Sequence, residues 1–83
     1  MISRYWYDNC PECKQGRLFV MKESAQGNLF LLCEECESAW RSPEETVDLQ
    51  KTFNITGLCF GFGNRENIAR AGWSRYVLKE AKT

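Results

Sequence analysis

Two pairs of cysteines constrain this chain more than any other feature of its sequence. Cys10 and Cys13 form the first C-x2-C pair, and after nineteen intervening residues Cys33 and Cys36 form the second. Two such pairs separated by about 15–20 residues are typical of zinc sites, because a hairpin between them brings the second pair back beside the first. Four thiolates surround Zn²⁺ tetrahedrally at about 2.3 Å. The spacing predicts one structural Zn²⁺ bound by these four cysteines.

Three other interpretations of these cysteines are open. A rubredoxin-like iron site uses similar pairs and would make the chain an electron carrier. The stretch Cys10-Pro11-Glu12-Cys13 also resembles a thiol–disulfide redox centre, although here a strand is predicted to follow it rather than a helix. The four thiols could also be unliganded core residues. Zinc is favoured because spacing and predicted hairpin agree, and a closed set of four thiolates indicates a structural metal.

The length of the chain fits a need for such a site. Eighty-three residues allow one small domain, 1–83, whose apolar burial barely offsets the conformational entropy lost on folding. The sequence has no histidine, which excludes mixed Cys/His metal sites and histidine-based catalysis. We therefore expect a protein that is not an enzyme. The formal net charge is zero, which argues against strong binding to nucleic acid.

The apolar stretches are short. None approaches the length of a membrane span, which takes about 20 residues. The first residues also lack a hydrophobic signal core. We expect a cytoplasmic protein with no membrane contact. In that compartment, paired cysteines indicate metal or redox chemistry rather than structural disulfides.

The local patterns predict an α+β fold, with a small β-hairpin sheet and one or two short helices. Strands are expected over 17–23 and 29–33, joined by a turn at 26–28, with a third short strand over 38–41. Ser42 followed by Pro43 and Glu45 predicts a capped helix that runs to about Lys51 and buries Val47.

The remaining residues predict a second helix and a last strand. Asn64 is a candidate cap for a helix through Ala71 that ends at Gly72, and a strand is expected over 73–79 with Trp73 and Tyr76 packed inward. Residues 54–63 are expected to form a loop or irregular strand. Its phenylalanines are predicted to fill the core, and Cys59 is predicted to be a small buried residue.

The hairpin with its two cysteine pairs resembles the zinc ribbon over about residues 8–41, with 42–80 as an extension. The resemblance implies the metal and the local fold. It does not imply one function, because zinc ribbons occur in transcription factors, ribosomal proteins, polymerase subunits and protein-binding modules. The family often has glycine directly after each pair, where the backbone takes a positive φ. This chain has Lys14 and Glu37 there.

A second resemblance covers more of the chain. Cys-Glu-Glu-Cys-Glu at 33–37, Trp40, Ser-Pro-Glu-Glu at 42–45 and Glu-Asn-Ile-Ala-Arg-Ala-Gly-Trp at 66–73 look like small bacterial proteins. Some of those are encoded beside polymorphic or contact-dependent toxins and act as immunity proteins. The resemblance implies a protein-binding module that neutralises a toxin. The alternatives are a nucleic-acid- or transcription-associated zinc ribbon and the rubredoxin-like carrier.

Two regions are candidate partner surfaces. An acidic stretch balanced by Arg41 alone could meet a basic toxin, or could be a solvated face. An aromatic arm near the N-terminus could pack on the core, contact a protein or stack on bases. The acidic residues are Glu34, Glu35, Glu37, Glu44, Glu45 and Asp48, and the aromatic arm is Tyr5, Trp6 and Tyr7.

Overall fold

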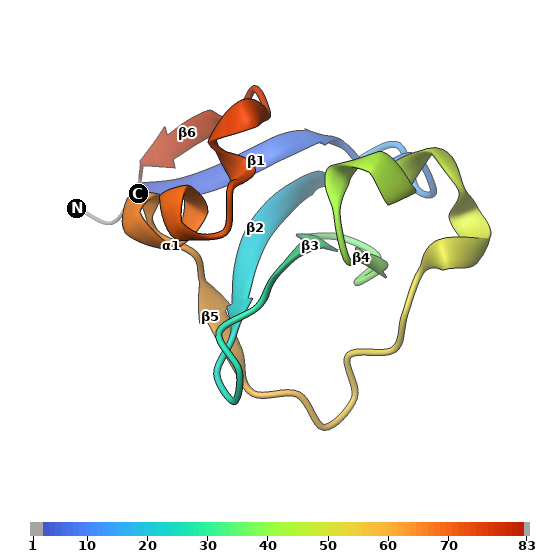
Figure 1. Ribbon diagram of the computed structural model, residues 1–83. Coiled ribbons are helices and arrows are strands. Elements are labelled where there is room, and N and C mark those ends of the chain that lie inside the picture. The colour runs from blue at the N-terminus through green and yellow to red at the C-terminus, as the bar shows by residue number, and fades with distance from the viewer. Residues whose placement is uncertain (1–2, 83) are drawn as a thin grey trace.

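One antiparallel sheet of six strands organises the computed structural model, which describes residues 3–82 (Figure 1). The strand order is β4-β3-β2-β1-β6, and β5 pairs with β2 beside β1. The first half of β2 pairs with β1 and its second half with β5, so two distant segments share one edge of this central strand. The strands are β1 (Ser3–Asn9), β2 (Arg17–Glu23), β3 (Leu29–Cys33), β4 (Ala39–Trp40), β5 (Phe60–Phe62) and β6 (Lys79–Lys82).

The helical elements are short. They are α1 (Arg65–Arg70) and the 3₁₀ turns η1 (Pro43–Val47), η2 (Leu49–Lys51) and η3 (Trp73–Arg75). The α+β prediction is confirmed, and the hairpin of β2 and β3 has the predicted bounds. Within residues 3–82, none of the helices has the length and apolar character needed to cross a membrane.

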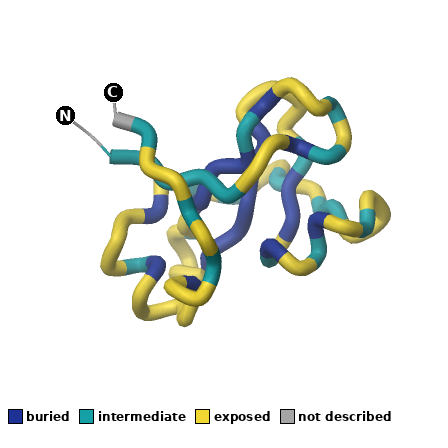
Figure 2. The backbone as a smooth tube through the Cα atoms, turned by 90° about the horizontal axis from the view of Figure 1, so that it is seen from above, coloured by how far each residue is buried: buried dark blue, intermediate teal, exposed yellow. Residues whose placement is uncertain are grey.

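The hairpin of β2 and β3 is buried on both faces (Figure 2), because its apolar residues run almost without interruption. Side chains alternate between the faces of a strand, so the hairpin contributes to two apolar clusters. The first contains the fully buried Trp40 and also Ile68 and Trp73 from the C-terminal half. The second lies on the opposite face around Phe30, with Phe53 and Phe60 in edge-to-face contact. The long segment 48–60 therefore covers the second face.

The second helix forms as predicted. The side chain of Asn64 accepts a hydrogen bond from the backbone N–H of Asn67, whose side chain accepts one from the N–H of Asn64. A complete capping box therefore begins α1. Gly72 takes a φ of 74° just after the helix, a conformation that favours glycine. The helix buries Ile68, which ties α1 to the first cluster.

The first predicted helix is wrong in type and in its cap. Residues 43–51 form two 3₁₀ turns separated by Asp48, which is extended. Ser42 makes no capping hydrogen bond, and Val47 is 90% exposed rather than buried. The hydroxyl of Thr46 instead turns back and donates to the carbonyl of Pro43 at 2.7 Å. Such a local bond competes with helical pairing.

The C-terminal strand lies later than predicted. Residues 73–75 form η3, and the strand is β6, which pairs with β1. The inward packing of Trp73 is confirmed, and Tyr76 is half-buried against the first cluster. The aromatic arm belongs to β1, which lies between β2 and β6 in the strand order, so the arm lies within the sheet.

Candidate metal centre

The sulfur atoms of the two cysteine pairs meet at one point between the β1–β2 turn and the β3–β4 turn. All four lie within 4.8 Å of one another. The Sγ atoms of Cys10 and Cys36 are 3.7 Å apart, and those of Cys13 and Cys33 are 3.6 Å apart. Ligands at about 2.3 Å from a tetrahedral ion lie about 3.8 Å from each other. The four cysteines therefore cluster within metal-binding distance, at a spacing that suits an ion of this size.

Two similar turns hold the cysteines. In the first, the N–H of Lys14 donates to the carbonyl of Cys10 at 2.9 Å, and the N–H of Cys10 donates to the carbonyl of Gly16 at 2.7 Å. In the second, the N–H of Cys33 donates to the carbonyl of Ser38 at 2.9 Å. Lys14 and Glu37 both have a φ of 61°, the positive φ expected after each pair. Side chains other than glycine thus occupy strained positions in both turns.

Gly16 is a structural requirement that the spacing of the cysteines does not indicate. A Cβ atom at this position would lie 2.6 Å from the Sγ of Cys33 and 2.9 Å from the Cγ of Glu35. Any larger residue would push the second pair away from the first. The sequence carries no signal for this contact, because Gly16 lies close to Cys33 only in the folded chain.

The environment of the sulfurs differs across the cluster. Burial raises the pKa of Cys33 to about 12 and also raises that of Cys10. Backbone N–H groups of Gln15 and Gly16 lower the pKa of Cys13 to about 6. The N–H groups of Glu35 and Cys36 point to the Sγ of Cys33 at 3.3 and 3.4 Å, which suits a thiolate. A cation at the centre would stabilise the buried thiolates that burial alone disfavours.

Residues beyond the four cysteines support the second turn. Cys36 is exposed, and its sulfur lies 3.3 Å from the hydroxyl oxygen of Ser38. That hydroxyl donates to a carboxylate oxygen of Glu12 in the first turn at 3.1 Å. Ser38 and Glu12 therefore link the two turns, a role that residue type and spacing alone do not reveal.

The fifth cysteine lies outside the cluster. Cys59 is exposed, so its predicted burial is wrong. Phe60 is half-buried on the second cluster, whereas Phe62 is 40% exposed, so only part of the predicted core packing is found. Phe60 packs edge-to-face on Phe30, and Phe62 packs edge-to-face on Phe19 with the Arg4 guanidinium over its ring.

Several of the acidic candidates have structural partners. Glu34 binds Arg17 through both carboxylate oxygens at 2.8 and 3.1 Å, which lowers the pKa of Glu34. Glu44 accepts a short hydrogen bond from the Tyr76 hydroxyl and also pairs with Arg75, and the pKa of Glu44 is lowered.

Of the other acidic candidates, one caps a 3₁₀ turn and three are exposed or half-buried. The side chain of Asp48 accepts a hydrogen bond from the N–H of Gln50 at 2.9 Å and so caps η2. Glu35 and Glu37 are exposed, and Glu45 is half-buried.

The aromatic arm is part of the sheet. Tyr5 and Tyr7 pack against the first cluster, and Trp6 packs against the second on the opposite face. The ammonium group of Lys79 lies 4.7 Å from the centre of the Trp6 ring. These contacts agree with the core-packing interpretation of the arm.

Comparison of the chain with protein family models, curated proteins and solved structures gave no match. The geometry of its own residues therefore carries the functional interpretation.

Proposed function

We propose that this chain is a non-enzymatic protein-binding module whose fold depends on one structural Zn²⁺ bound by Cys10, Cys13, Cys33 and Cys36. The observation that carries the proposal is the convergence of four sulfurs within 4.8 Å of one another. Four thiolates fill a tetrahedral shell and leave no position for substrate or water, so this ion stabilises the fold rather than catalysing a reaction.

A shared metal site is preferred to a redox role because sulfurs from different pairs lie 3.6 and 3.7 Å apart, which is the arrangement of a common ligand set rather than of one reactive pair. Zinc is the ion we propose, because the cysteine spacing is typical of structural zinc sites. The visible absorption spectrum of the purified protein separates the metals, because thiolate-bound iron is coloured and zinc is not.

The proposed partner face combines carboxylates with exposed apolar side chains. Val47 is 90% exposed and Leu49 48% exposed, and both belong to the segment that also carries Glu45. Apolar groups bordered by polar ones mark many protein interfaces. Glu35, on the β3–β4 turn, is a further exposed carboxylate. These carboxylates suit a basic protein, and a toxin neutralised by an immunity protein is the specific partner we propose.

The test of the partner is an affinity measurement against the toxin domain encoded by a neighbouring gene. The double variant Glu35→Lys/Glu45→Lys reverses two carboxylates and leaves Asp48, which caps η2, in place. We expect association to slow and the binding free energy to weaken by about 2–5 kcal/mol where a desolvated charge pair is broken. The control is Glu66→Lys, an exposed carboxylate on α1. Equal affinity of the double variant and the control variant would contradict this partner face.

A further inference from the structure

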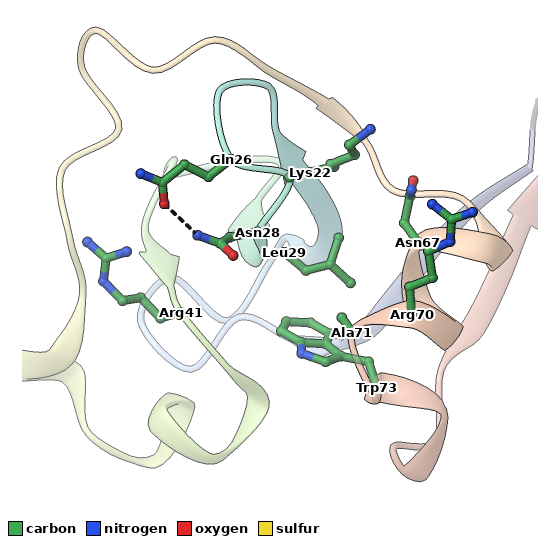
Figure 3. A pocket seen from close by; sticks show the side chains of 10 residues that line it. Lys22, Gln26, Asn28, Leu29, Arg41, Asn67, Arg70, Ala71 and Trp73 are labelled. Atoms are coloured by element: carbon green, nitrogen blue, oxygen red, sulfur yellow. Dashed lines mark hydrogen bonds between the residues drawn. The ribbon is translucent and has the colours of Figure 1, made fainter.

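A basic cavity of about 730 Å³ lies on the side of the molecule where the β2–β3 hairpin turn faces α1 (Figure 3). Its wall comes from three segments that are far apart in sequence: the hairpin turn, the residue after β4, and the end of α1 with the start of η3. The volume falls within the range of about 300–1,000 Å³ that is usual for small-molecule sites. The lining residues are Lys22, Gln26, Gly27, Asn28, Leu29, Arg41, Asn67, Arg70, Ala71 and Trp73.

The charge of the cavity differs from that of the whole chain. The chain has equal numbers of acidic and basic residues, yet the lining contains Lys22, Arg41 and Arg70 and no acidic residue. Arg70 makes an exposed ion pair with Glu66 at 3.3 Å, whereas Lys22 and Arg41 form no ion pair with a carboxylate among residues 3–82. Such a concentration of one sign of charge in a concave surface attracts anions.

The floor of the cavity is apolar. Leu29 and Trp73 lie between the cationic side chains, with Arg41 to one side and Lys22 and Arg70 to the other (Figure 3). Both floor residues are buried, at 8% and 7% exposure, so the cavity meets the edge of the first cluster. A bare inorganic anion would leave this apolar surface unused.

Side-chain amides also line this cavity. The NH₂ group of Asn28 donates to the carbonyl oxygen of Gln26 at 3.2 Å, so these two side chains hold each other in place. Asn67 uses its carbonyl oxygen to accept from the N–H of Asn64 at 2.9 Å, which leaves its NH₂ group as a donor. Amides can recognise the polar edge of a planar heterocycle, while cations bind a phosphate.

We propose that this cavity binds a nucleoside monophosphate, with the phosphate held by Lys22 and Arg70 and the base placed against Leu29 and Trp73. The volume suits one nucleotide. A longer nucleic acid is disfavoured because the chain has zero net charge and its cations are not arranged as an extended stripe. The site is separate from the four cysteines, and its failure would leave the proposed zinc and protein-binding roles intact.

The experiment is isothermal titration calorimetry of the metal-loaded protein with adenosine 5′-monophosphate. We expect a dissociation constant below about 1 mM, with adenosine and inorganic phosphate each at least about tenfold weaker, because each lacks one half of the interaction. Equal affinity for inorganic phosphate would overturn the nucleotide assignment. Binding of a single-stranded oligonucleotide without binding of the monophosphate would also overturn it.

Two substitutions test the position of the site. Lys22→Gln and Arg70→Gln should each weaken binding of the monophosphate by about tenfold, because each removes one charge-assisted interaction with phosphate on that side of the floor (Figure 3). The matched control is Lys51→Gln on η2, which removes the same charge away from the cavity lining and should leave the affinity unchanged. Thermal unfolding of each variant shows whether the fold is kept. An equal loss of affinity in the control would mean that net charge alone causes the effect, and it would overturn the proposed site.

Discussion

Residues 3–41 and residues 42–82 stabilise this molecule in different ways. The first region contains β1 to β4 and both cysteine pairs, and in the described chain it supplies every buried aliphatic, aromatic and cysteine side chain except Pro43, Ile68 and Trp73. The second region contains the short helical elements and the long segment across the second cluster. It is attached through the pairing of β5 with β2 and of β6 with β1. A few buried side chains also connect it to the first region, as do polar contacts such as the hydrogen bond from the indole N–H of Trp40 to the carbonyl of Asp48.

The contrast shows where the stability of such a small chain must arise. Burial and the cysteine cluster act together in the first region, since Cys10 and Cys33 belong to the same apolar cluster as Leu31 and Trp40. In the second region, local bonds set the shape of segments that bury little. Disruption of the first region should therefore unfold the whole chain, whereas changes in the second should have small effects.

The largest effect is expected at the metal centre. Cys33→Ser should abolish cooperative folding, because zinc binding contributes about 10–16 kcal/mol in small zinc peptides. The total stability of a small domain is only about 5–15 kcal/mol. Cys59→Ser is the matched control, since Cys59 is exposed and outside the cluster. Circular dichroism during thermal unfolding distinguishes them, and a cooperative transition in Cys33→Ser would contradict the comparison.

A core substitution should have the next largest effect. Leu31 is fully buried in the middle of β3, so Leu31→Ala should lower the free energy of unfolding by about 2–5 kcal/mol. Val47 lies in the second region and is 90% exposed. Val47→Ala should therefore change the free energy of unfolding by no more than about 0.5 kcal/mol. Urea denaturation at constant zinc measures both, and similar losses for the two variants would contradict the contrast between the regions.

The capping box of α1 should have an intermediate effect. Asn64→Ala removes the side-chain acceptor at the start of the helix and should lower stability by about 0.5–2 kcal/mol. Asn54→Ala is a useful comparison, because the Asn54 side chain accepts a single hydrogen bond from Thr56 in an exposed turn. The same denaturation experiment should show the smaller loss for Asn54→Ala, and the reverse order would argue against a role for α1 in fastening the second region.

The smallest effect is expected at the contact between Glu44 and Tyr76. The pKa of Glu44 is lowered from its ordinary value of 4.5, chiefly by the hydrogen bond from Tyr76. This contact therefore stabilises the fold above that ordinary value and is lost as the pH falls through the lowered pKa. Tyr76→Phe should move the pKa of Glu44 back toward 4.5 and lower the unfolding temperature at neutral pH less than Asn64→Ala does. An NMR titration of the Glu44 carboxyl group measures the first change, and an unchanged pKa would exclude the hydrogen bond in solution.

The sequence predicts most of the first region because its signals are local or periodic. The spacing of the cysteine pairs implies the hairpin, and the apolar run of β2 and β3 gives its strands. The positions of Lys14 and Glu37 after the two pairs indicate where the backbone takes a positive φ. The same logic applies to α1, where Asn64 and Gly72 mark the two ends.

The second region is less predictable because non-local contacts decide it. The pattern Ser42-Pro43-Glu44-Glu45 favours a helix, but Asp48 is extended and its backbone carbonyl accepts a hydrogen bond from the indole of Trp40 at 3.2 Å. The strand at the C-terminus begins at Lys79 because it pairs with β1, which local sequence does not reveal. The acidic stretch is also less uniform than its composition suggests, since distant residues such as Arg17 neutralise part of it.

The most direct test of the central claim is the metal content of the folded protein. Native mass spectrometry with elemental analysis should find one zinc ion per chain and no iron. Removal of that ion by a strong chelator should abolish the cooperative unfolding transition, because the buried thiolates of Cys10 and Cys33 would lose the cation that stabilises them. A well-folded protein that contains no metal, with an unfolding transition that the chelator leaves unchanged, would contradict the account.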